Sequence, residues 1–270
     1  MPVGVAFRST GVFFPLVTGK DSGCGVAYLR FAKAQLARPF DKAAHYRAFE
    51  RAVHGATDEG LGGGNHFLSL EESEQYFYVL VHTGSRNLGI QWYQENYALL
   101  QRYNPGGEWL PTEVADKDYQ RRYAAVLDYA SARRRQFCEK ILAFLQRNKY
   151  VGDMPVEYAD SCHNLLEFGA NDVIHRKGST QLVAGRNAVL PLSMSRGSLI
   201  VRPDPHVPYA LSRIAQPLRR IRQQHPAGIR LRLQGFGKHP GNAAFPAACG
   251  RYDTDSDGEV YWSMMNVVKG

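Results

Sequence analysis

Five side chains of the types that bind metal ions stand next to glycine or asparagine, or at the end of an expected strand. They are Asp21, Cys24, His66, His82 and His163. Carboxylate, thiolate and imidazole groups bind borderline divalent metals such as manganese, zinc or iron, and glycine-rich backbone lets a ligand or a phosphate approach closely. A lone histidine at a strand end is more often structural, but three of them with an acid and a thiol favour a metal site. Their spacing does not choose among the three metals.

These residues come from separate segments of the chain. Asp21 and Cys24 are three residues apart in one glycine-dense turn, so both can face one ion. His66 ends a second glycine-rich segment. His82 follows residues 76–81, a continuous aromatic and apolar run that is typical of a buried strand. A metal site therefore requires a fold that brings these segments together.

The elements expected around these segments are of both types. Residues 3–17 are β-rich, and residues 118–148 carry apolar side chains at steps of three, four or seven, which predicts an amphipathic helix. Arg133, Arg134 and Arg135 are expected on the solvated face of that helix, with RNA contact as the alternative. Further helices are expected over residues 41–54 and 209–224, and further strands over residues 172–175, 181–190, 198–201 and 229–233, with a hairpin at the tail. Since no repeat or clear linker divides the sequence, we predict one compact mixed α/β (α+β) domain over residues 1–270.

The composition is that of a globular protein. Of the 270 residues, 44% are hydrophobic and 21% are charged, which argues against disorder. No run approaches the roughly 20 apolar residues that a membrane helix needs, so no membrane association is expected. Four unpatterned cysteines exclude a disulfide scaffold and favour a reducing cytoplasm. The net charge of +8 favours polyanionic partners such as RNA or DNA.

Six short segments follow one another in the order in which they occur in RtcB RNA ligases. They are Asp-Ser-Gly-Cys-Gly at 21–25, Gly-Gly-Gly-Asn-His-Phe at 62–67, His-Thr-Gly-Ser-Arg at 82–86, Cys-His-Asn at 162–164, His-Arg-Lys-Gly at 175–178 and Val-Val-Lys-Gly at 267–270. Each segment is short, but six in order are not expected by chance. The chain therefore resembles this family over nearly its whole length. The resemblance implies β-sheets around a metal-binding cleft, with helices at the periphery.

The resemblance also implies an activity and a set of site residues. The family joins an RNA 3′-phosphate or 2′,3′-cyclic phosphate end to a 5′-hydroxyl end, using GTP and Mn²⁺. Two manganese ions are implied, with Cys24 as the thiolate that bridges them. The implied metal ligands are Asp21, Cys24, His66, His82 and His163. The implied nucleotide-binding residues are Asn65, His66, Ser193, Met194 and Lys269, and the basic side chains implied to meet phosphate or RNA are Arg86, Arg176 and Lys177.

Several residues differ from the family pattern in segments that the resemblance implies to bind or carry the nucleotide. The family's guanylylated histidine lies in a His-Gly-Ala-Gly-Arg segment that does not occur here, and the nearest counterpart is His206. In the glycine-rich nucleotide loop, Leu192 and Ser195 replace glycines, which affects how closely the backbone can approach a ligand. Ser69 stands where the family usually has glutamate.

The leading hypothesis is a GTP- and manganese-dependent RNA ligase in tRNA splicing or RNA repair, with His206 as the GMP carrier and Cys24 and Lys269 in the catalytic site. Its substrates would be tRNA halves or cleaved RNA ends, and an archease-like activator is a candidate partner. Two alternatives follow from the departures. One is a metal-dependent RNA-end phosphoesterase without ligase activity, and the other is a catalytically decayed RNA-binding relative.

Overall fold

The fold is known from a computed structural model, which describes residues 4–38, 60–63, 65–153, 156–183, 185–193, 197–202 and 213–215. It combines antiparallel sheets with two long helices, which confirms the predicted mixed α/β class. The helix expected over residues 41–54 and the strand expected over residues 229–233 lie outside the described residues. The helix expected over residues 209–224 is wrong where it is described, because Arg213–Ala215 pair with Ser179–Gln181 as a β-strand.

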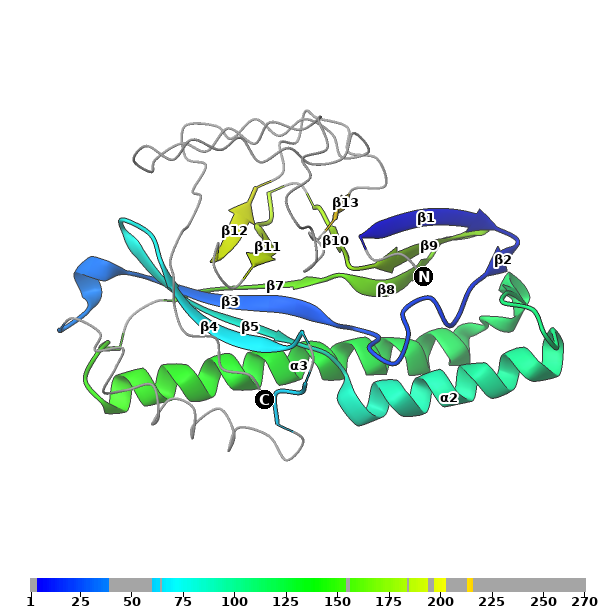
Figure 1. The fold of residues 1–270 in the computed structure, drawn as a ribbon, viewed down its shortest axis with the longest axis horizontal. Coiled ribbons are helices and arrows are strands. Elements are labelled where there is room, and N and C mark those ends of the chain that lie inside the picture. The colour runs from blue at the N-terminus through cyan, green and yellow to red at the C-terminus, as the bar shows by residue number, and fades with distance from the viewer. Residues whose placement is uncertain are drawn as a thin grey trace.

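A four-stranded antiparallel sheet forms the centre of the molecule (Figure 1). Its strand order is β4 (Phe67–Glu72), β5 (Tyr76–Thr83), β3 (Gly25–Ala32) and β7 (Glu157–Cys162). The buried strand expected over residues 76–81 is confirmed as β5, which continues to Thr83. Both faces of this sheet are covered, so β3 and β5 are almost continuously buried.

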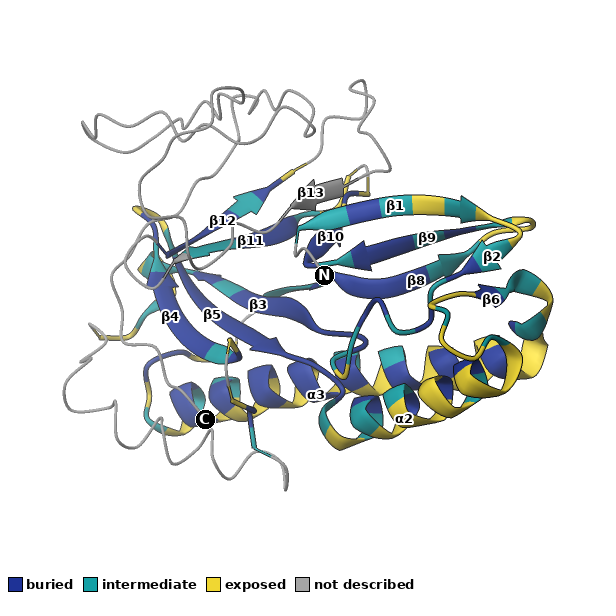
Figure 2. Ribbon diagram, turned by 45° about the vertical axis from the view of Figure 1, so that its right-hand side comes forward, coloured by how far each residue is buried: buried dark blue, intermediate teal, exposed yellow. Residues whose placement is uncertain are grey.

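Helix α3 (Lys117–Arg147) covers one face of the central sheet, and α2 (Arg86–Tyr103) lies beside it. Asp116 begins α3 by accepting a hydrogen bond from the Tyr119 amide at 2.8 Å, as N-cap residues do. Successive strand residues point to opposite faces, so alternate residues of β3 such as Leu29 pack against Phe137 and Ile141 of the helix. Figure 2 shows the helices buried toward the sheet and exposed on their outer sides.

The opposite face of the central sheet is covered by a hairpin. Strands β11 (Ala188–Ser193) and β12 (Gly197–Val201) form it, and Val189 packs against Tyr28 and Tyr78. The buried Glu71 carboxylate on β4 accepts hydrogen bonds from the amide and hydroxyl of Ser198 on β12. The hairpin is thereby joined to the sheet by polar as well as apolar contacts.

A second sheet continues from the first. It contains β1 (Val5–Thr10), β9 (Asp172–Lys177) and β8 (Asn164–Phe168), and β8 follows β7 directly in the chain. An aromatic core that includes Phe13, Trp92, Tyr119 and Tyr123 packs it against the helices. The smaller elements are the strand pairs β2 (Val12–Phe13) with β6 (Leu110–Pro111) and β10 (Ser179–Gln181) with β13 (Arg213–Ala215), and the 3-10 turns η1 (Lys33–Gln35) and η2 (Thr112–Val114).

Two further differences from the expected elements concern residues 181–190 and residues 86–103. Residues 181–190 are not one strand, because Gly185 takes a positive φ in the loop between β10 and β11. The sequence analysis gave no element for residues 86–103, which form α2. The buried stripe of this helix consists of Gly89, Trp92, Asn96 and Leu100, so glycine and asparagine weaken the apolar pattern that would reveal it.

The solvated face expected for the arginine run is wrong for two of its three members. Arg133 and Arg134 are 3% and 1% exposed, whereas Arg135 is exposed as expected. The buried pair points toward the turns at the end of the central sheet, where backbone carbonyl groups and Asp160 accept hydrogen bonds from it.

None of the described helices combines the length and the apolar character needed to cross a membrane.

Candidate metal centre

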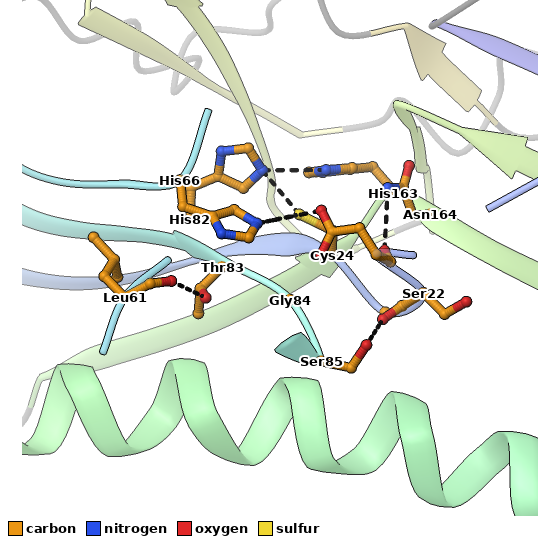
Figure 3. A network of polar contacts seen from close by, with 12 residues as sticks. Ser22, Cys24, Leu61, His66, His82, Thr83, Gly84, Ser85, His163 and Asn164 are labelled. Atoms are coloured by element: carbon orange, nitrogen blue, oxygen red, sulfur yellow. Dashed lines mark hydrogen bonds and ion pairs between the residues drawn. The ribbon is translucent and has the colours of Figure 1, made fainter. Parts of the chain in front are cut away.

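The register of the central sheet brings the five expected ligands to one end of it. Strands β3 and β4 start where the antiparallel β5 and β7 finish, with Val26 and Phe67 both opposite His82 and with Gly25 opposite Cys162. Asp21 and Cys24 lie in the turn before β3, His66 immediately precedes β4, and His163 follows β7. Figure 3 shows Cys24, His66, His82 and His163 facing one another across these strand ends.

The donor atoms form two groups that share one sulfur. The Cys24 Sγ lies 3.1 Å from His82 Nε2, which is 3.3 Å from His163 Nε2. The same sulfur lies 3.5 Å from His66 Nε2, which is 3.2 Å from the Asp21 carboxylate. The two groups able to hold an ion are therefore Cys24–His82–His163 and Asp21–Cys24–His66.

Burial sets the charge state of the histidines. It lowers the pKa of His82 to about 3 and lowers the pKa of His163 well below its usual value. Both imidazoles are therefore neutral at pH 7, and neutral imidazole is the form that binds metals. Burial would raise the pKa of Asp21, but hydrogen bonding and charge from His66 outweigh it and hold that pKa well below its usual value. The donor set fits a divalent cation, since a carboxylate, a thiol and imidazole nitrogens converge in a largely buried site.

Burial has the opposite consequence for metal binding at Cys24, because it favours the protonated thiol. Burial and the neighbouring Asp21 carboxylate raise its pKa well above the usual value. A bound cation deprotonates a coordinating thiol outright, because the ion is the largest charge in such a site. Metal binding is thus expected to release a proton from Cys24, and competition by protons makes such affinity depend on pH.

Two glycines permit the close approach of these side chains. A Cβ on Gly84, directly after β5, would overlap the carboxylate of Asp21, and a Cβ on Gly62 would overlap the ring of His66. Gly62 also has a φ of 109°, which side-chain-bearing residues rarely adopt. The glycines that flank the candidate ligands in the sequence therefore have a steric cause.

Comparison with known proteins identifies the family of the chain. A family model described as tRNA-splicing ligase RtcB matches residues 40–211. The chain belongs to the RtcB family. Among curated proteins, RNA-splicing ligase RtcB2 of Escherichia coli is 28% identical over 238 residues, an alignment that covers 75% of this chain and 60% of the relative. The chain thus spans less than two thirds of the length of that RtcB protein.

The other residues that the RtcB resemblance singled out are distributed unevenly around the cluster. Lys177 is half-buried and donates a hydrogen bond to the Thr18 carbonyl at 2.7 Å. Burial lowers the pKa of Lys177, and electrostatic interaction with Asp21 and Cys24 opposes that shift. Arg86 is half-buried at the start of α2, with its side chain against Gly62. Arg176 is 1% exposed and ion-paired with Glu167, so its guanidinium is engaged within the protein. Its predicted role at phosphate or RNA is untested.

The nucleotide-binding residues expected from RtcB are only partly described. Asn65 is exposed beside His66, and the backbone of Ser193 ends β11. Met194, His206 and Lys269 lie outside the described residues. The guanylylation half of the predicted site therefore remains a prediction.

Three residues near the cluster were missed by the sequence analysis as parts of a site. Arg133, Arg134 and Asp160 surround the backbone of the segments that carry the ligands. Asp160 is three residues from His163, a proximity visible in the sequence, but its partner on α3 is 26 residues away and no local pattern connects them.

Proposed function

We propose that this RtcB member is a metal-dependent RNA ligase that joins a 3′-phosphate or 2′,3′-cyclic phosphate end to a 5′-hydroxyl end, with Mn²⁺ and GTP. The observation that carries the proposal is the pair of donor groups that share the Cys24 sulfur. A shared thiolate suits two adjacent cations. Two bound cations supply a clamp that stabilises the attacking and leaving oxygens of an in-line phosphoryl displacement.

The protein's own side chains have distinct roles in this proposal. Asp21, His66, His82 and His163 hold the cations around Cys24. Lys177 and Arg86 stand at the edge of the cluster as positive groups for phosphate oxygens. Burial of the histidines excludes most water, which strengthens every electrostatic interaction with a phosphate there.

The nucleotide half of the proposal rests on the family pattern. His206 would attack the α-phosphate of GTP, displace pyrophosphate and carry GMP, while Lys269, Asn65, Ser193 and Met194 would bind the nucleotide. A 3′-phosphate is a poor electrophile until it is capped by a nucleotide, so a histidine carrier divides one difficult step into easier ones.

The decisive test is guanylylation. The full chain is incubated with Mn²⁺ and GTP labelled at the α-phosphate, and the products are separated under denaturing conditions at neutral to alkaline pH. We expect a labelled protein band that is lost in His206→Ala, in Cys24→Ala and after chelation of the metal. His225→Ala serves as the matched histidine control and should keep the label. Label that survives His206→Ala would assign the carrier to another histidine.

A second assay separates ligation from hydrolysis. The substrate is an RNA with a 2′,3′-cyclic phosphate at one end, supplied with a 5′-hydroxyl fragment. The ligase proposal requires a joined product that depends on GTP. Leu192 and Ser195 stand where the family has glycines, and the His-Gly-Ala-Gly-Arg segment is missing. Both departures favour a phosphoesterase as the second candidate. Opening of the cyclic end without GTP, and no joined product with it, would support the phosphoesterase.

The wider assignments are part of the same proposal. We propose that residues 1–270 act as one ligase domain in the cytoplasm, on tRNA halves or other cleaved RNA ends, with an archease-like protein as a candidate activator. RNA binding that persists after metal removal and in His82→Ala, without joining or hydrolysis, would instead indicate a decayed RNA-binding relative.

A further inference from the structure

Two neighbouring arginines of helix α3 reach the segments that carry the candidate metal ligands. Arg133 and Arg134 are among the most buried charged side chains of the described part of the chain. Burying a guanidinium is costly unless it is paired and hydrogen-bonded. The two guanidinium groups donate hydrogen bonds to backbone carbonyls of the segments that carry the candidate ligands, and Arg134 is also paired with Asp160.

Arg134 joins the turn of Cys24 to the end of β5. Its Nη1 donates to the Gly23 carbonyl at 2.7 Å and to the Thr83 carbonyl at 3.0 Å. Gly23 directly precedes Cys24, and Thr83 directly follows His82. One nitrogen thus connects the backbone next to two ligands of the Cys24–His82–His163 group.

The same guanidinium is anchored to the strand that leads to His163. Arg134 Nε and Nη2 donate to the two carboxylate oxygens of Asp160 on β7, at 2.6 and 2.9 Å. This paired, planar geometry is available to arginine and not to lysine. Gly25 leaves the room for it, since a Cβ there would lie 3.1 Å from the Arg134 Cζ.

Arg133 makes a different connection. Its Nη2 donates to the Gly60 carbonyl at 2.6 Å, and its Nε donates to the Gly84 carbonyl at 3.2 Å. Gly60 begins the described segment that leads to His66, and Gly84 is packed directly against the Asp21 carboxylate. Of the two residues that Arg133 joins, Gly84 therefore lies against a ligand of the Asp21–Cys24–His66 group, and Gly60 belongs to the part of the chain that precedes His66.

We propose that Arg133 and Arg134 are positioning residues, each of which fixes the geometry of one of the two metal-binding groups. Arg134 sets the Cys24–His82–His163 group, and Arg133 sets the Asp21–Cys24–His66 group. This inference rests on the proposed metal-binding function and adds a separate positioning role for each of two adjacent side chains. A purely structural role would make both sites weaken together, in proportion to the loss of stability.

The test measures each group separately. His66→Ala leaves only the Cys24–His82–His163 group complete, and His163→Ala leaves only the Asp21–Cys24–His66 group. Arg134→Lys and Arg133→Lys are each placed in both backgrounds. Co²⁺ is titrated into the metal-free full chain, and the thiolate-to-cobalt absorption from Cys24 reports its affinity. The exposed neighbour Arg135→Lys is the matched control, and thermal unfolding of each metal-free variant is recorded alongside.

The expected result is a crossed pattern. Arg134→Lys should lower Co²⁺ affinity about 10- to 100-fold in the His66→Ala background, as loss of outer partners of a metal site does. The loss should be clearly smaller in the His163→Ala background, where Cys24 is the one ligand next to an Arg134 contact. Arg133→Lys should show the reverse, and Arg135→Lys should change neither. Equal weakening in both backgrounds, or weakening that only follows the unfolding midpoint, would overturn the inference.

Two further outcomes are distinguishable. If the unmodified chain binds no Co²⁺ or Mn²⁺, the proposed function fails and the inference fails with it. If the unmodified chain binds metal and the arginine variants behave like Arg135→Lys, the inference alone fails. If Arg134→Lys does not fold, Arg133→Lys decides the question, because its selective effect on the His163→Ala background is required.

Discussion

At the scale of single residues, the candidate centre is defined by which protonation state burial permits. The imidazoles of His82 and His163 are kept neutral, with their Nε2 atoms turned toward each other and toward the Cys24 sulfur. The nitrogens of these neutral imidazoles are available to a metal cation, whereas their protonation is unfavourable. These residues could be recognised as candidate ligands from the sequence, but their protonation states depend on burial, which only the fold creates.

This arrangement predicts a pH dependence of stability for the metal-free chain. The pKa of His82 is about 3 when folded and 6.5 in the ordinary case, so the unfolded state binds the extra proton between these values. Stability is therefore lost as the pH falls below 6.5, with a contribution from His82 of about 1.4 kcal/mol per pH unit. Urea unfolding at several pH values should show a shallower slope for His82→Gln than for the unmodified chain. Equal slopes would contradict the burial of a neutral His82.

A second prediction concerns Gly84. A Cβ at this position would overlap the Asp21 carboxylate, so Gly84→Ala should displace that ligand and lower Mn²⁺ affinity at least about tenfold. Gly152→Ala is the control, because a Cβ at Gly152 has open space around it. Calorimetric titration of both variants with Mn²⁺ measures the difference. Unchanged affinity in Gly84→Ala would mean that Asp21 is not a ligand.

At the scale of elements, helix α3 shows where sequence patterns succeed and fail. Its extent was predicted almost fully, because apolar side chains repeat along one face of it. Its arginines were misplaced, since a helical pattern locates apolar residues and cannot reveal a buried charge whose partners come from distant segments. The carbonyls of Gly23 and Thr83 and the carboxylate of Asp160 become visible as partners only in the folded chain.

The buried ion pair of α3 gives a prediction about stability. Asp160→Asn leaves the Arg134 charge, which is 2% exposed, without its counter-ion. Removing one partner of such a pair costs about 3–5 kcal/mol. Asp118→Asn on the same helix breaks pairs whose partners are 80% and 50% exposed, and it should cost at most about 1 kcal/mol. Urea unfolding at neutral pH compares the two, and similar costs would contradict a compensating role for Asp160.

At the scale of the whole molecule, the fold brings together the five residues predicted as metal ligands, whereas Met194, His206 and Lys269 lie outside the described residues. Glycine-flanked ligand types at Asp21, Cys24, His66, His82 and His163 were recognisable without structure, and the sheet register brings them together. The sequence offers no comparable pattern around His206, where the family's glycines are missing. Arg176 is ion-paired with Glu167, and its role at phosphate or RNA stays a prediction.

The order of the ligands along the chain has a consequence for synthesis. The first candidate ligands, Asp21 and Cys24, precede β3, whereas His163 lies at the passage from the central sheet to the second one. A chain made from its N-terminus displays a thiol and a carboxylate long before the last imidazole exists. The Cys24–His82–His163 group cannot take its final geometry until β7 has added to the edge of β3, whereas all ligands of the Asp21–Cys24–His66 group precede β7 in the chain. If the centre binds metal as proposed, an ion in the Cys24–His82–His163 group is therefore bound only after this part of the fold has formed.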